Sequence, residues 1–550
     1  MAMKRSIVTP MVVAFFSVIT GGWLLQEGVS RANDVYVQAR VLQEVVDRVS
    51  DSFVDEVERD LLYNSAIDGL IRELGDPHSS FMPAADYEDL RIRTEGEYGG
   101  VGLEVVDRGG YVTVVSPIPG GPGSRIGIRA GDQFYEIEGV AADTMFTDQA
   151  VELLRGRPGT DVKVSVLRPG IEAPIEFTIT REAIVLRAVP FSLMLNDQVG
   201  YVPLLSFRET SATELRAAID SLRADEGMRS LVLDLRGNPG GLLDQGIAVT
   251  DLFLSEGKSI VETRGRDANQ NELYTAVTPD QYPEMPVVIL VDKASASAAE
   301  IIAGALQDHD RATLVGETTF GKGSVQSLYR LTGGDVLRLT TAKWYTPVGR
   351  SIHFDPDSRL ASSEKSEAKW AYSITGQMVE PVTLEGRPEF VSGGGRTLYG
   401  GGGITPDVHA YPETLSLVQS SGVLHLFQRG GGFSVALFNY AVEYVGEHPS
   451  IKVGFSLTAE DVEAFYEVLV DDESFADLAE LRAAESFVRY HMEREIALQA
   501  WGAEGKFRQL QSYDRQLARA LDLLVEVETP AELIAVALEG TSDEIPEWQK

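Results

Sequence analysis

The chain has 550 residues, more than one ordinary domain holds, so we expect about three or four folded units. Asp and Glu number 83 against 48 Lys and Arg, which gives a formal net charge of −35. A field of that sign repels phosphate backbones and anionic lipid headgroups, so nucleic acid is not expected as a partner. The sequence has no cysteine, which excludes disulfides, thiolate metal sites and cysteine nucleophiles.

Residues 1–32 have the pattern of an export signal. Lys4 and Arg5 precede a largely apolar segment over residues 7–25. A span of roughly 20 residues of this kind fits either a long signal peptide or an uncleaved membrane anchor. Both alternatives place the rest of the chain on the extracytoplasmic side of a membrane.

Residues 33–95 are predicted to form a helical arm, because apolar side chains recur there at steps of three and four residues. The first part of this pattern consists of Leu42, Val45, Val46, Val49, Phe53 and Val54. Residues 96–184 contain short apolar runs between Gly, Pro and Asp turns, which predicts a small β-rich domain.

Residues 185–354 alternate predicted strands with predicted helices, which is typical of an α/β core. Residues 355–400 are polar and Gly-rich and are predicted to be a surface insertion. Residues 401–410 then return to the core, and residues 411–550 are predicted to form an acidic helical extension. The sequence therefore predicts a multidomain α/β fold.

Three segments of the α/β core gather chemically unusual residues: LDLRGNPGG over 233–241, KASASAAE over 293–300 and GETTFGKGSVQ over 316–326. Ser297 is predicted to open a helix after a strand, where neighbouring backbone N–H groups are free to bind an oxyanion. Serine needs a nearby base, and a lysine can serve if burial disfavours its ammonium form. Lys322 lies between two glycines in an otherwise uncharged run, so it is the candidate base.

The local sequence leaves plainer interpretations open. A serine at this position often only caps the following helix, and a lysine in a glycine turn is often only solvated. The seven histidines show no triad or H-E-x-x-H pattern, and no G-x-S-x-G motif is present.

Together the three segments resemble the carboxyl-terminal processing peptidases, the tail-specific serine proteases. The family pattern is S-A-S-x-x-E, then G-A-L-x-D, then G-x-x-x-x-G-K-G-x-x-Q. Ser297, residues 304–308, Lys322 and Gln326 match it at the expected spacing. One departure is Ala299, where a serine is common in the family.

The resemblance implies a crotonase- or ClpP-like catalytic core and a serine endopeptidase that needs no metal or cofactor. Ser297 would be the nucleophile, Lys322 the general base, and Gln326 the group that orients the lysine amine. The backbone N–H groups of Ala298 and Gly241 would form the oxyanion hole. The pair Gly240-Gly241 leaves the register of the second donor open.

The β-rich domain carries a glycine-rich run, Gly99-Gly100-Val101-Gly102-Leu103, before a predicted strand. Free N–H groups in such a turn can bind a carboxylate, and the adjoining strand edge can pair with an extended peptide. The run resembles the carboxylate-binding loop of a PDZ domain. This resemblance implies protein substrates that are bound by their C-termini and cleaved nearby, in the periplasm of a bacterial envelope. An adaptor or activator protein, a homo-oligomer and an N-terminal anchor stay open as partners.

Two other functions compete with this reading. The first is a phosphate-binding P-loop, whose pattern is nearly matched by Gly316, Gly321 and Lys322. However, Gly323 follows the lysine where a P-loop needs Ser or Thr, and the next residues predict a strand rather than a helix. The second alternative is a catalytically silent PDZ adaptor, which has no chemical need for a serine, a lysine and a glutamine at this spacing.

Overall fold

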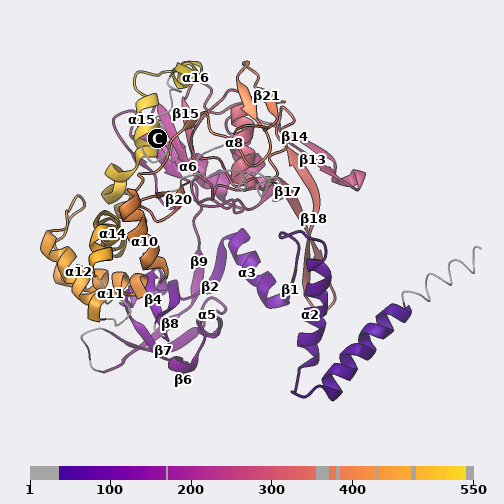
Figure 1. Cartoon of the computed structure of the whole chain (residues 1–550), viewed down its shortest axis with the longest axis vertical. Coiled ribbons are helices and arrows are strands. Elements are labelled where there is room, and N and C mark those ends of the chain that lie inside the picture. The colour runs from indigo at the N-terminus through magenta and orange to yellow at the C-terminus, as the bar shows by residue number, and fades with distance from the viewer. Residues whose placement is uncertain are drawn as a thin grey trace, which may run out of the picture. The chain divides into compact units, whose positions relative to one another are not determined.

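The computed structural model describes residues 36–108, 110–168, 171, 173–354, 371–379, 384–428, 432–471 and 478–539. The predicted export segment over residues 1–32 lies outside this part of the chain. The chain forms two compact units, residues 1–85 with 326–340, and residues 86–325 with 341–550 (Figure 1). Within the described residues, no helix combines the length and apolar character that a membrane span requires.

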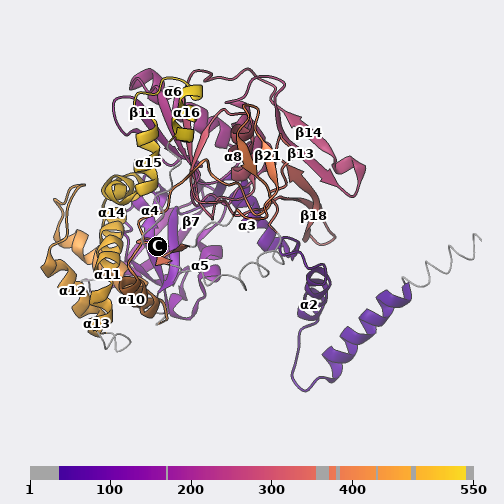
Figure 2. The ribbon, with the colours of Figure 1, turned by 45° about the horizontal axis from the view of Figure 1, so that its top comes forward.

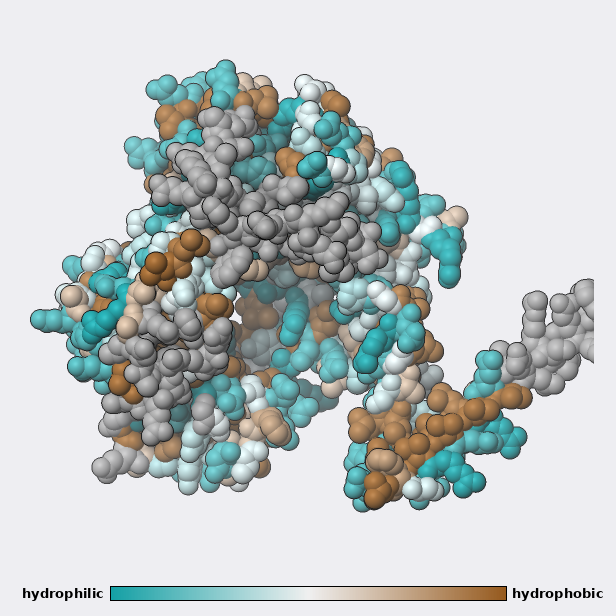
Figure 3. Space-filling model, viewed as in Figure 1, coloured by the Kyte–Doolittle hydropathy of each residue, from teal (hydrophilic) through white to brown (hydrophobic). Residues whose placement is uncertain are grey.

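The smaller unit contains the helical arm and part of a β-sheet. Its elements are a helix over residues 36–52, α2 (Arg59–Arg72), β1 (Ser80–Met82), most of β17 (Ser324–Arg330) and the first half of β18 (Val336–Tyr345). β1 runs antiparallel to β18 with Ser80 opposite Arg338, and β17 also pairs with β18. The segment with the apolar spacing of three and four residues forms the helix over residues 36–52. Much of the apolar side of this helix faces solvent and is visible as a brown stripe along it (Figure 3).

The larger unit begins with the small β-rich domain predicted for residues 96–184. Its elements are α3 (Ala84–Glu95), β2 (Glu97–Gly100), β3 (Leu103–Arg108), β4 (Tyr111–Pro117), α4 (Pro122–Arg125), β5 (Gln133–Ile137), β6 (Val140–Ala141), α5 (Thr147–Leu154), β7 (Asp161–Leu167), β8 (Ile175–Thr180) and β9 (Glu182–Val185). The main sheet is antiparallel in the order β3-β4-β5-β7-β8, with β6 paired to β5, and β2 pairs separately with β9. Val112, Phe134, Val164 and Ile179 lie in its core.

A six-stranded sheet forms the centre of the larger unit, in the order β10-β11-β12-β15-β16-β23. Its elements and the helices after its strands are β10 (Leu193–Met194), β11 (Val199–Pro203), α6 (Ser211–Asp225), β12 (Ser230–Asp234), α7 (Leu243–Asp251), β15 (Val287–Val291), α8 (Ala298–Asp308), β16 (Thr313–Gly316) and β23 (Val408–His409). β11 to β23 are parallel to their neighbours, and β10 is antiparallel at the edge.

Both faces of this sheet are covered, which explains why its strands are continuous apolar runs rather than alternating ones. Along β15, Val287, Ile289 and Val291 pack with α6, α7 and α8. Val288 and Leu290 face the other side, where they pack with helices from the C-terminal end of the chain.

The predicted C-terminal extension, residues 411–550, contains two groups of helices. The first is α10 (Leu417–Gln428), α11 (Gly432–Glu447), α12 (Ala459–Asp471), α13 (Leu478–Ala483) and α14 (Glu485–Leu510). α10, α11, α12 and α14 share one hydrophobic core, and α13 lies beside α10. The second is α15 (Arg515–Leu523) and α16 (Pro530–Glu539), which lie beside the six-stranded sheet in both ribbon views (Figures 1 and 2). The last helices therefore form one layer of the α/β core.

α11 also contacts the small β-rich domain. The Arg108 guanidinium at the end of β3 lies 3.7 Å from the centroid of the Phe438 ring and donates to the Ser434 carbonyl at 3.2 Å. The C-terminal helices thus contact both the β-rich domain and the α/β core.

The remaining strands form hairpins around the core. They are β13 (Ser259–Gly265) with β14 (Glu272–Thr275), β19 (Ala371–Tyr372) with β20 (Met378–Val379), and β21 (Glu389–Val391) with β22 (Thr397–Tyr399). β13 also pairs with the second half of β18. The last two hairpins belong to the predicted surface insertion, of which residues 355–370 and 380–383 lie outside the described part.

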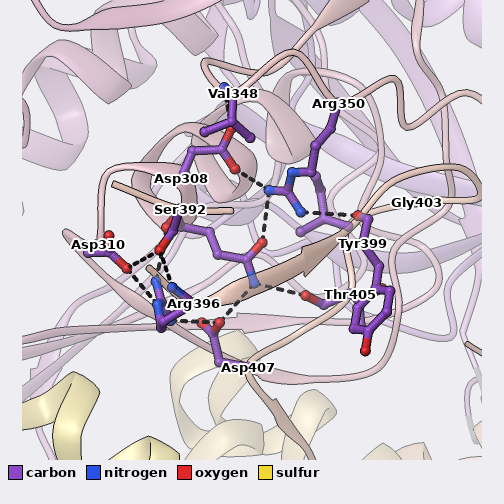
Figure 4. A network of polar contacts seen from close by, with 12 residues as sticks. Asp308, Asp310, Val348, Arg350, Ser392, Arg396, Tyr399, Gly403, Thr405 and Asp407 are labelled. Carbon is purple, nitrogen blue, oxygen red and sulfur yellow. Dashed lines mark hydrogen bonds and ion pairs between the residues drawn. The ribbon is translucent and has the colours of Figure 1, made fainter. Parts of the chain in front are cut away.

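A buried ionic network fixes the β21–β22 hairpin to the end of α8 (Figure 4). Arg396 donates to Asp310 at 2.6 Å, to Asp407 at 2.7 Å and to the Gln307 carbonyl at 2.9 Å. Arg350 pairs with Asp308, and both side chains are fully buried. This part of the insertion is therefore held by largely buried charges.

We expect Arg350→Met to lower the free energy of unfolding by about 3–5 kcal/mol, because the buried Asp308 carboxylate loses its counter-ion. The matched control is Arg264→Met, which breaks an exposed pair with Glu262 and should cost less than about 1 kcal/mol. Urea unfolding monitored by tryptophan fluorescence measures both. An Arg350 effect no larger than the control would contradict the role given to the buried pair.

Candidate active site

Ser297 lies between the end of β15 and the start of α8, at the N-cap position of the helix. Its backbone has φ 55° and ψ −114°, a conformation that costs energy for a residue with a side chain. Every residue of α8 is buried, so the packing of the helix can hold this strained turn in place. Ser297 itself is half-buried and therefore stays accessible.

One fully buried carboxylate joins the serine segment to the lysine segment. Glu300 Oε2 accepts the backbone N–H of Ser297 at 2.8 Å and that of Lys322 at 2.9 Å. Its Oε1 accepts the Gly321 N–H at 2.7 Å and the Thr319 hydroxyl at 2.6 Å. The backbones of Ser297 and Lys322 thus meet at the same oxygen atom.

Further hydrogen bonds fix the lysine segment. Phe320 N–H donates to the Ser295 carbonyl at 3.0 Å, and the indole N–H of Trp344 donates to the Lys322 carbonyl at 3.1 Å. Gly321 has φ 89°, and a Cβ there would lie 2.9 Å from Phe354 and 3.0 Å from the Gly403 nitrogen, so no larger residue fits. Lys322 is half-buried, like Ser297.

Burial dominates the electrostatics of Glu300. Removal from water raises the pKa of this carboxyl to about 7, although its four hydrogen bonds act in the opposite direction. The carboxylate is therefore held by its donors at a substantial cost in desolvation. Its role was not part of the sequence prediction, although a glutamate three residues after a helix-opening serine has the spacing of a capping box.

The two glycines before α7 have different hydrogen-bonding states. Gly240 N–H donates to Asn238 Oδ1 at 2.8 Å, and a Cβ at Gly240 would lie 2.7 Å from the Cβ of Ser297. Among the described residues, neither Gly241 N–H nor Ala298 N–H has a hydrogen-bond acceptor. The geometry therefore favours Gly241 over Gly240 as the second donor to an oxyanion.

Gln326 lies on β17, in the smaller unit. There its side-chain amide donates to Thr340 Oγ1 at 3.3 Å. Its predicted action on the lysine amine stays a prediction. Because β17 begins at Ser324, the glycine-lysine run leads into a strand, whereas a P-loop leads into a helix N-terminus that holds phosphate.

The glycine-rich run of the β-rich domain spans the end of β2 and the start of β3. Gly99 and Gly100 end β2, Val101 and Gly102 form the turn, and Leu103 begins β3. The carbonyls of Val101 and Gly102 accept N–H groups from Gly123 and Ile118, both at 2.9 Å. β3 packs near α5, with partly buried side chains of both elements against the domain core.

Acidic and histidine side chains are potential metal ligands of this chain. Within the described part of the chain, no three of them lie close enough together to hold a metal ion.

Three family models match the chain. The peptidase family S41 model matches residues 198–360, a PDZ domain model matches residues 113–168, and the model of the activating protease CtpB N-terminal domain matches residues 25–86. The S41 range includes Gly241, Ser297, Lys322 and Gln326. Along the chain, the CtpB N-terminal domain comes first, the PDZ domain second and the S41 peptidase third.

Similar curated proteins include carboxy-terminal processing proteases. The carboxy-terminal-processing protease of Bartonella bacilliformis is 41% identical over 322 residues, which are 58% of this chain and 73% of that protein. The carboxyl-terminal-processing protease of Synechocystis is 38% identical over 52% of this chain and 68% of its own length. Among solved structures, the photosystem II D1 C-terminal processing protease is 28% identical, with a TM-score of 0.34 over 57% of this chain and 89% of that chain.

The predicted multidomain α/β fold with a PDZ domain is thereby confirmed, as is the predicted family. This chain belongs to the carboxy-terminal processing proteases of peptidase family S41 and is a serine-type peptidase with a PDZ domain.

Proposed function

We propose that Ser297 is the nucleophile of this peptidase, that Lys322 is its general base, and that the enzyme cleaves exported proteins held by their C-termini. The observation that supports this assignment most directly is the shared Glu300 oxygen, which fixes the backbones of both residues. The apolar segment over residues 7–25 supports a location in the cell envelope.

The reaction proceeds in two acyl-transfer steps. The neutral Lys322 amine takes the Ser297 hydroxyl proton while Oγ attacks the peptide carbonyl carbon. The carbonyl oxygen becomes an oxyanion and accepts hydrogen bonds from Gly241 N–H and Ala298 N–H. The lysine ammonium then protonates the leaving amine as the C–N bond breaks, which leaves an acyl-enzyme. Water, deprotonated by the same amine, hydrolyses this ester and restores the serine.

The PDZ domain supplies substrate recognition in this proposal. The N–H groups of the turn from Gly99 to Leu103 would receive the substrate carboxylate. The edge of β3 would pair with the extended tail of the substrate, and the apolar side chains of β3 and α5 would contact its last residue. Holding the tail raises the local concentration of the adjoining chain at Ser297.

Ser297→Ala and Lys322→Ala should each reduce cleavage of an unfolded test protein by at least about 1000-fold, because each removes an indispensable part of one nucleophile–base pair. Gel analysis and mass spectrometry of the products measure the loss, and circular dichroism checks the fold. Lys293→Ala, an exposed lysine of the same core, is the matched control and should stay active. Full activity of either site variant would contradict the assignment.

Glu300→Gln should lower kcat/KM by about tenfold or more at pH 8, because an amide offers one acceptor oxygen and its NH2 group opposes the N–H donors. The pKa of Glu300 lies near 7, so the wild-type carboxyl is ionised at pH 8 and largely protonated at pH 6. A protonated carboxyl has lost part of its acceptor capacity, so the wild-type advantage should shrink at pH 6. The exposed Glu262→Gln is the control. An equal wild-type-to-variant ratio at both pH values would exclude the ionised carboxylate as the organising group.

Substrates with a free C-terminal carboxylate and an apolar last residue should have a KM at least about tenfold lower than their C-terminal amides, because the amide removes the charge that the PDZ turn binds. Steady-state cleavage of paired peptides tests this. A short peptide without a tail, present in acid and amide forms, serves as the control and should show no difference. Equal KM values for the long pair would refute the proposed recognition.

A further inference from the structure

The turn that presents Gly241 begins at Arg236, and Arg236 is held by a residue from the C-terminal helices. We propose that Asp514, the N-cap of α15, is a positioning residue of the oxyanion hole that acts through Arg236. This inference rests on the proposed function, since it assumes that Gly241 N–H binds the oxyanion. Asp514 lies outside the ranges matched by the three family models.

All five N–H donors of the Arg236 guanidinium have acceptors. Nη1 donates to Asp514 Oδ1 at 2.8 Å and to Gln516 Oε1 at 3.0 Å. Nη2 donates to Asp514 Oδ2 at 2.7 Å and to Asp234 Oδ2 at 2.6 Å, and Nε donates to Asp234 at 3.0 Å. Asp514 and Gln516, at the start of α15, therefore accept three of these five bonds. The bidentate pair of Arg236 with Asp514 fixes the plane of the guanidinium.

Asp514 gives the Arg236 guanidinium a second carboxylate partner beside Asp234. Burial alone would lower the pKa of Arg236, but Asp234 and Asp514 together hold it well above its usual value. Asp234 has other donors as well, namely the Tyr201 hydroxyl at 2.7 Å and the backbone N–H of Arg236 at 2.9 Å. Without Asp514, Nη1 keeps only the neutral Gln516 oxygen and Nη2 keeps only Asp234, so the outer end of the guanidinium is held less firmly.

Asp514 is itself firmly placed. Its carboxylate accepts the Leu517 N–H at 2.9 Å, in the usual manner of a helix N-cap. Leu517, Ala520 and Leu523 of α15 pack against Val232 and Leu290 of the sheet. The carboxylate that meets Arg236 is thus fixed to the same sheet from which the turn emerges.

From Arg236 the chain reaches the oxyanion donor in five residues, through a turn with little freedom. Gly237 N–H donates to Asp292 Oδ1 at 3.0 Å, and Asn238 Nδ2 donates to the Leu204 carbonyl at 2.7 Å. The Asn238 carbonyl accepts the Ala296 N–H at 2.9 Å, next to the nucleophile. A Cβ at Gly241 would lie 2.1 Å from the Phe207 carbonyl oxygen, so Gly241 is tightly confined there. Asp514 thus anchors the first residue of the turn, and Asp292, Leu204 and Ala296 hold the residues between it and Gly241.

A displaced Gly241 N–H would weaken binding of the oxyanion but leave the recognition of the substrate tail intact. We therefore expect Asp514→Ala to lower kcat by about tenfold to 100-fold while KM stays within about twofold. The affinity for a peptide aldehyde, which forms a tetrahedral adduct with the serine, should fall in parallel with kcat. Asp514→Asn, which keeps one acceptor oxygen, should lie between wild type and Asp514→Ala. Asp522→Ala, an exposed aspartate on the same helix, is the matched control.

Asp514→Ala is also made in an Arg236→Met background, to distinguish a positioning role of Asp514 from simple capping of α15. If Asp514 acts through Arg236, Asp514→Ala has no further effect on kcat in that background, whereas a capping role through Leu517 N–H would lower kcat there as much as in wild type. The proposal is overturned by an unchanged kcat in Asp514→Ala, by additive effects with Arg236→Met, or by a loss that only follows the unfolded fraction. Ser297→Ala in the same assay tests the proposed function separately. An inactive Ser297→Ala together with a fully active Asp514→Ala would contradict the role of Asp514 and leave the role of Ser297 supported.

Discussion

The candidate active site is organised around a single carboxylate that water cannot reach. Glu300 accepts hydrogen bonds from three backbone N–H groups and one hydroxyl, and these come from two segments that follow the neighbouring strands β15 and β16. A buried carboxylate without such donors would be far too costly to keep charged. The donors and the carboxylate therefore require each other, and this mutual requirement places the backbones of the serine and lysine segments side by side.

The sequence was sufficient to predict the α/β core, because strands and helices depend on local patterns. Local patterns left the roles of Ser297 and Lys322 open, and the family resemblance supplied them as predictions. Strands such as Val287–Val291 are apolar throughout since each face of the sheet is covered, and Ser297 and Lys322 lie where such elements end. The organising role of Glu300 could not be predicted in the same way. Three of its donors are backbone N–H groups, which every residue except proline possesses, so no residue type reveals them.

Other features depend on contacts between distant parts of the chain. The Gly240-Gly241 register is invisible in sequence because the two residues are identical, and only the Asn238 amide oxygen distinguishes their N–H groups. The polar composition of residues 355–400 predicted a surface insertion, yet Arg396 within it is buried against Asp310 and Asp407. An arginine in a polar segment gives no sign of a partner that lies 86 residues away.

The helices that cover one face of the six-stranded sheet, α15 and α16, come late in the chain. Val232 and Leu290 are synthesised well before α15 and α16, the helices that shield their side of the sheet from water. Until a growing chain includes residues up to Glu539, that apolar layer lacks its cover and Arg236 lacks its partner 278 residues downstream. A nascent copy of this chain therefore contains the Ser297 segment long before the helices that complete the surroundings of the Arg236 turn.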